Sequence, residues 1–121
     1  MFAEAPDKQH VIEQLFQGLL EEAVGDAGRQ GCFMVNCMVE LAPHDPDVQR
    51  IAQNHQAEMQ FAIADTIRDG QMAGQIGSTQ DPKALADFLY NAIIGLRALG
   101  KVQPNSSVLE NATRITLAAL S

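Results

Sequence analysis

Apolar residues recur at helical spacing in five segments of the chain, and short polar breaks separate these segments. The first segment runs from Asp7 to about Gly25, and the second runs from Cys32 to Ala42. Residues three and four apart share one face of a helix, so the first pattern predicts an amphipathic helix capped by Asp7. Its apolar stripe consists of Val11, Ile12, Leu15, Phe16, Leu19 and Leu20. The second segment is apolar on nearly all sides, and we expect it to lie inside the fold.

A break between helices is predicted at Pro43-His44-Asp45-Pro46. Asp45 suits the N-cap position and Pro46 the first turn, where its missing N–H costs nothing. The stripe that follows is long and ends near Gly70 or Gly74, and it consists of Val48, Ile51, Ala52, His55, Met59, Ala62, Ile63, Thr66 and Ile67. A third helix that spans most of the domain is therefore expected.

Two further helices are predicted after the polar linker from Gly77 to Gln80. Asp81-Pro82 repeats the cap and proline, before Leu85, Phe88, Leu89, Ala92, Ile93, Leu96 and Leu99. Within this helix, Gly95 and Gly100 remove side chains where another helix could approach closely. The region Pro104 to Ser106 opens the last helix, which carries Val108, Leu109, Ala112, Ile115, Thr116, Ala119 and Leu120. No segment alternates like a strand, so the sequence predicts one all-α domain of five helices over residues 1–121.

Composition narrows the classes of function. The 121 residues are 46% hydrophobic and carry a net charge of -7, without a cluster of lysine or arginine. This charge repels the phosphate backbone, so the chain is not expected to bind nucleic acid by itself. No apolar run approaches the roughly 20 residues that a membrane span requires, and no secretion signal opens the chain. We therefore expect a soluble, cytoplasmic protein.

The two cysteines point to neither a disulfide nor a metal site. Cys32 and Cys37 are five residues apart in one predicted helix, which turns their side chains roughly 140° apart. No histidine stands at ligand spacing beside them, so no metal or cofactor is expected. Cys32 begins a helix, where the dipole favours a reactive thiolate, and this suggests an oxidant or electrophile sensor as an alternative. A cysteine packed as a small hydrophobic residue is the competing interpretation.

Catalytic residues are not expected. The acidic pairs Glu21-Glu22 and Asp45/Asp47 belong to a solvated helix face and to a helix start. The serines lie in loops or at the end of the chain, without an accompanying histidine and acid. The sequence therefore predicts a protein that is not an enzyme.

Several segments in a fixed order resemble the C-terminal regulatory domain of tetracycline-repressor (TetR/AcrR) family transcription regulators. They are Gly31-Cys32-Phe33 leading to Asn36 and Glu40, then 41–46, then Ile67 to Ile76 with its Gly-Gln-Met-Ala-Gly turn, then Asp81-Pro82, and then Phe88 to Leu99 around Gly95. In that family an N-terminal helix-turn-helix head binds an operator, while the C-terminal domain binds an effector and dimerises through its last two helices. Only about thirty residues precede Gly31, so we expect this chain to lack the head. Contact with DNA would then require a head that is absent from this chain.

The resemblance, together with apolar positions beyond a single face of the last two helices, implies a homodimer built as a four-helix bundle. We place at its interface Leu89, Ile93, Leu96, Arg97, Gly100, Leu109, Ala112, Ile115, Thr116 and Ala119. The competing interpretation is that both helices pack entirely inside the monomer.

The resemblance also implies a pocket for a small apolar or amphipathic effector, between the first three helices and the start of the fourth. Its candidate lining residues are Phe16, Leu20, Asn36, Cys37, Met38, His55, Met59, Ile63 and Phe88. Methionine repacks readily around different ligands, although core packing explains each Met or Phe as well. His55 and Asn36 could instead satisfy buried backbone groups.

We therefore expect the ligand-sensing and dimerisation domain of a repressor, which couples effector binding to the placement of DNA-binding heads. A headless module that heterodimerises with full-length regulators is an alternative from another class. A redox or electrophile sensor built on Cys32 is a second.

Overall fold

A computed structural model describes residues 7–25, 33–102 and 105–121, and these ranges are helical with short turns and no strand. The helices are α1 (Lys8–Val24), α3 (Phe33–Asn36), η1 (Cys37–Leu41), α4 (Pro46–Met72), α5 (Pro82–Gly100) and α6 (Ser106–Ala118). Because α3 continues directly into η1, the described ranges contain five helical segments. The predicted all-α class is confirmed.

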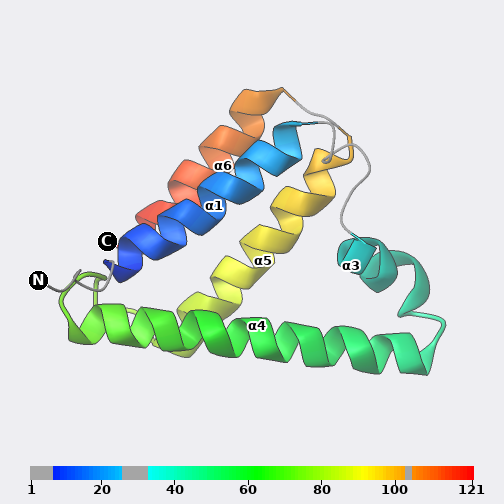
Figure 1. Cartoon of the computed structure of the whole chain (residues 1–121), viewed down its shortest axis with the longest axis horizontal. Coiled ribbons are helices and arrows are strands. Elements are labelled where there is room, and N and C mark those ends of the chain that lie inside the picture. The colour runs from blue at the N-terminus through cyan, green and yellow to red at the C-terminus, as the bar shows by residue number, and fades with distance from the viewer. Residues whose placement is uncertain (1–6, 26–32, 103–104) are drawn as a thin grey trace, which may run out of the picture.

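Three helices form a layer, and the longest helix crosses one end of it. α1 contacts both α5 and α6, and α5 also contacts α6. α4 packs most extensively on α5 and runs across the end of the layer, while α3 and η1 lie near the opposite end of α4 from the chain termini (Figure 1). The fold is thus a small bundle with one long crossing helix.

The predicted caps set the helix boundaries. A carboxylate oxygen of Asp7 accepts hydrogen bonds from the first turn of α1, the nearest at 2.8 Å from the N–H of Gln9. Asp45 caps α4 in the same way, and Asp81 accepts from the N–H of Ala84 at 3.0 Å to cap α5. α4 ends just before Gly74, whose φ of +74° favours glycine. These boundaries agree with the sequence prediction within a few residues.

One hydrophobic core joins α1, α4, α5 and α6. Its most deeply buried large side chains are Phe16, Ile67, Leu89, Ile93, Leu109 and Leu120. At Gly100 an added Cβ would lie 3.2 Å from the backbone of Ala23, so the predicted close helix approach is confirmed there, with α1 as the neighbour. At Gly95 an added Cβ would meet nothing within 4 Å, so none of the described helices is in contact with that position.

The second segment does not lie inside the fold as its apolar composition suggested. Val35 is buried, but Val39 is 68% exposed and Leu41 is 51% exposed. The segment contacts α4 and α5 on one side only and lies at the end of the bundle, so its other side faces solvent (Figure 1). It also winds into a π-helix, closed by a 2.9 Å hydrogen bond from the N–H of Ala42 to the carbonyl of Cys37.

Candidate functional site

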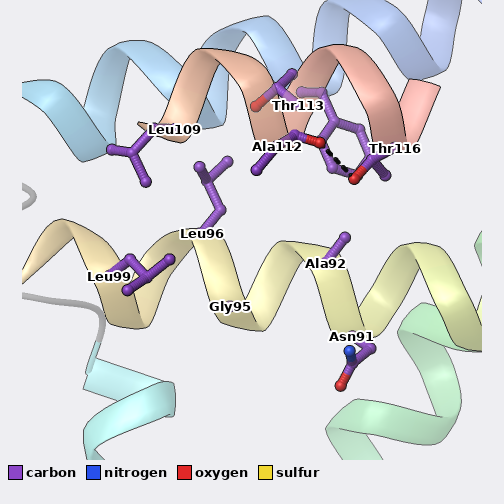
Figure 2. Close-up of a pocket in the computed structure, with 10 residues that line it drawn as sticks. Asn91, Ala92, Gly95, Leu96, Leu99, Leu109, Ala112, Thr113 and Thr116 are labelled. Carbon is purple, nitrogen blue, oxygen red and sulfur yellow. Dashed lines mark hydrogen bonds between the residues drawn. The ribbon is translucent and has the colours of Figure 1, made fainter. Parts of the chain in front are cut away.

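A groove with a volume of about 200 Å³ lies between α5 and α6. Its floor includes Leu96 and Leu109, which extend toward one another from the two helices (Figure 2). The other lining residues are Phe16 from α1, Asn91, Ala92, Gly95 and Leu99 from α5, and Ala112, Thr113 and Thr116 from α6. The groove is therefore mostly apolar, with Thr113 and Thr116 on its α6 wall.

The two threonine hydroxyls of this wall differ in their hydrogen bonding. The hydroxyl of Thr116 donates to the carbonyl of Ala112, one turn earlier, at 2.7 Å (Figure 2). The hydroxyl oxygen of Thr113 is buried and has no hydrogen-bond partner among the described residues. Thr113 as a whole is only 7% exposed. A buried hydroxyl without a partner lowers the stability of the fold.

The predicted effector-site residues divide between the core and its edge. Phe16 and Ile63 are buried in the core, and Leu20, Met38 and Met59 are partly buried against it. Cys37 and His55 are half-buried. These residues lie on α1, α4 and the α3–η1 segment, and the pocket predicted between them stays a prediction.

Phe88 and Asn36 occupy other surroundings. Phe88 is 46% exposed and lies on the face of α5 that also carries Ala92, Gly95 and Leu99, four, seven and eleven residues later. The amide oxygen of Asn36 accepts a 2.7 Å hydrogen bond from the ammonium of Lys101, which links α3 to the end of α5. That bond favours the structural interpretation of Asn36.

Six of the predicted dimer residues are buried by the chain itself, namely Leu89, Ile93, Leu96, Gly100, Leu109 and Thr116. Arg97 and Ala119 are half-buried, while Ala112 and Ile115 are exposed. Ile115 is 63% exposed, and Val108 on the same face of α6 is 47% exposed. The surface that remains for a partner is therefore the outer side of α6 together with Phe88 and Leu99 on α5.

The groove was not predicted from the sequence, although the spacing of the apolar residues that border it indicates two facing stripes. The outer positions of α6 recur as Val108, Ala112, Ile115 and Ala119, with the spacing of one helix face. The stripe on α5 has the same spacing and could have been paired with it. Which face of each helix meets α1 depends on tertiary packing, and that decided which residues stayed exposed.

Clusters of charged side chains are sparse in the part of the chain that the structure describes. Its residues include no group of three or more His, Cys, Asp or Glu that could hold a metal ion. The ion pairs there, such as Lys83 with Asp87 at 3.2 Å, are exposed pairs within one helix and contribute little to stability.

Across these described helices, none is both long and apolar enough to cross a membrane. Cys32 lies outside the described residues.

Comparison with known proteins identifies the class of this helical domain. A family model described as the tetracyclin repressor-like C-terminal domain matches residues 10–116. The chain belongs to this family, whose members are regulatory domains rather than enzymes.

One relative is an uncharacterised HTH-type transcriptional regulator, YezE of Bacillus subtilis (strain 168). It is 24% identical over 119 residues, which cover 97% of this chain and 61% of the relative. The chain thus spans about three-fifths of the length of that regulator. No solved structure matches the chain significantly.

Proposed function

We propose that this domain is the ligand-sensing and dimerisation part of a cytoplasmic transcriptional repressor, and that a DNA-binding head outside these residues reads the operator. The match of residues 10–116 to the repressor-like C-terminal family carries this proposal. In such a switch, the effector shifts the placement of the heads by binding one arrangement of the dimer more tightly than another.

The exposed apolar side chains of α5 and α6 support dimerisation. Phe88, Leu99, Val108 and Ile115 are each at least 43% exposed. Leu99 lines the groove, and the other three lie on the same two helices. Scattered apolar residues are normal on a surface, but a contiguous group of large ones on two adjacent helices is typical of an interface. Two copies related by a two-fold axis would bury this face against itself.

The cluster of Leu20, Met38, Met59 and His55 supports effector binding. Met38 and Met59 pack against the core without being fully buried, so their flexible side chains can move to admit a ligand. His55 adds a polar group at the edge of an otherwise apolar cluster. Cys37 and Met38 lie in the π-helix η1, and π turns occur frequently at functional sites. The proposed effector is a small apolar or amphipathic molecule.

The methionine methyl groups provide a direct test of this site. A panel of small apolar molecules is screened by thermal shift, and each stabilising compound is then titrated into protein with ¹³C-labelled methionine methyls. We expect saturable shifts of the Met38 and Met59 signals, because these methyls border the proposed pocket. Met72 is 82% exposed and serves as the internal control. If stabilising compounds leave Met38 and Met59 unchanged, the proposed effector site is wrong.

A further inference from the structure

We infer that the effector of this domain is an elongated acid, with an apolar body and one carboxylate, and that Arg97 and Lys101 of α5 bind the carboxylate. The inference rests on the proposed function, because it names the chemical class of the ligand for the effector cluster. It is carried by two observations. Neither cation has an acidic partner among the described residues, and both continue an apolar row on α5 that packs on the same core as Met38 and Met59.

One row of residues on α5 changes from apolar to cationic toward the end of the helix. Its members are Tyr90, Ile94, Arg97 and Lys101, which are four, three and four residues apart and so share one side of the helix. Tyr90 is buried, Ile94 is partly buried against the core, and Arg97 is half-buried. Lys101 is exposed at the C-cap of α5. The polarity of this row matches a molecule with an apolar body and an anionic end.

The row lies on the side of α5 that faces the effector cluster. The ammonium of Lys101 donates a 2.7 Å hydrogen bond to the amide oxygen of Asn36, so this end of the row faces α3. α3 contacts the C-terminal half of α5, and α4 crosses the N-terminal end of α5 (Figure 1). Arg97 follows Gly95 by two residues, which is about 200° around the helix. It therefore lies away from the face of α5 proposed for dimerisation.

The described part of the chain does not neutralise these two cations. Arg50, Arg68 and Lys83 each pair with an aspartate on their own helix, at 3.2 to 3.4 Å. Arg97 forms neither an ion pair nor a hydrogen bond with a described residue, and Lys101 bonds only to a neutral amide. The guanidinium of Arg97 thus keeps five N–H donors for a partner from outside these residues.

A carboxylate is the partner that this pair of cations favours. Like charges four residues apart on a helix repel one another, and an anion between them would remove this repulsion. A carboxylate would also accept charge-assisted hydrogen bonds from both, and such bonds are roughly twice as strong as bonds between neutral groups. The net charge of the chain is -7, which disfavours anions elsewhere on its surface. The carboxylate is therefore directed to this end of α5.

The length of the row determines the shape of the ligand. From Tyr90 to Arg97 the helix rises about 10 Å. Ile94, Met38 and Met59 are all partly buried against one core, and methionine side chains adapt readily to an apolar chain. Straight-chain carboxylates are therefore the first ligands to test.

The experiment compares hexanoate, octanoate and decanoate with the alcohols of the same chain lengths. Each is titrated into protein with ¹³C-labelled methionine methyls. At least one acid should give saturable shifts of Met38 and Met59 and should bind at least about tenfold more tightly than its alcohol. Added salt should weaken binding of the acid but not of the alcohol, because only the acid is held by charge.

Substitutions of the two cations test the location. Arg97→Met should remove the preference for the acid and leave the affinity for the alcohol within about twofold, because methionine is unbranched but uncharged. Lys101→Met, at an exposed position, should reduce the preference at least about threefold. If the cations only complement the C-terminal end of the helix dipole, Arg97→Met would lower the melting temperature without ligand and keep the native preference. That outcome would overturn the inference.

Lys83→Met is the matched control. Lys83 precedes Lys101 by eighteen residues, so it lies on the same side of α5 but about 27 Å away. It is paired with Asp87, and its replacement should leave the full preference for the acid. An equal loss of preference in Lys83→Met and Arg97→Met would contradict a site at the end of α5.

The failure of this inference can be distinguished from failure of the proposed function. Equal binding of acid and alcohol, with shifts of Met38 and Met59, would overturn the inference and leave the effector site in place. The same holds if no acid binds while other compounds of the apolar panel shift these methyls. If no compound of either set shifts them, the proposed effector site fails together with the inference.

Discussion

Individual glycines in these helices differ in what an added methyl group would meet. At Gly18 the space is open, whereas at Gly70 a Cβ would lie 2.5 Å from the Cδ1 of Ile76 and 2.9 Å from the Cβ of Lys8. Ile76 is only 3% exposed, so it cannot move aside freely. The same substitution should therefore have opposite effects at the two positions.

Replacing Gly70 by alanine should lower the free energy of unfolding by about 1 kcal/mol, because overpacking of about 1–3 kcal/mol exceeds the gain in helix propensity. Gly18→Ala should raise it by up to about 1 kcal/mol. Urea denaturation of both variants measures the difference. If Gly70→Ala proved as stable as Gly18→Ala, the close packing of the α4 end against α1 would be wrong.

Among the helices, α4 stands out because its two halves are packed differently. Its second half buries Ile63, Ala64, Ile67 and Gly70, whereas its first half buries only Ala52. Helices are stabilised mainly by the packing of their apolar face, so the first half depends more on its cap. Asp45 supplies that cap through a 2.9 Å hydrogen bond from the N–H of Asp47.

Asp45→Ala should therefore act locally. We expect faster amide hydrogen exchange in the first turns of α4, from loss of a cap worth about 1 kcal/mol, with little change in global unfolding. Asp81→Ala is the matched comparison, because α5 is buried along much of its length. That variant should lower global stability by about 1 kcal/mol. Similar exchange patterns in the two variants would contradict the difference in packing.

The starts of α1, α4 and α5 were predictable from the sequence because Asp7, Asp45 and Asp81 have side chains that cap a helix N-terminus. The π turn at Cys37 was not predictable, since an i to i−5 hydrogen bond leaves no pattern of residue types. The faces of α5 and α6 that the chain itself buries were not predictable either. Leu96 and Leu109 are apolar in the same way as Leu99 and Val108, and the packing of the helices on one another decides which pair is buried. The candidate groove was hidden for this reason, while the position of Met59 against the core followed from periodicity.

At the scale of the whole molecule, the proposed dimer should respond to one charged substitution and to salt. Ile115→Arg should raise the dimer dissociation constant by at least about tenfold, because it places a charge in an apolar contact. Ile51→Arg is the matched control, since Ile51 is 57% exposed but lies on α4. Each copy carries a net charge of -7, so screening by salt should strengthen the native dimer.

Sedimentation equilibrium of the three proteins at low and physiological ionic strength measures both effects. A native chain that stays monomeric, or equal dissociation constants for the two arginine variants, would exclude the outer face of α5 and α6 as the interface.

The unequal packing of α4 also has a mechanical consequence. Its second half is fixed by packing in the core, and its first half extends about 25 Å beyond that packing contact. A tilt of about 5° at that contact would displace Pro46 by about 2 Å. The π-helix contacts α4 and would move with it. A small change in packing around Ile63 can thus become a movement at the far end of the domain that is large compared with the change itself.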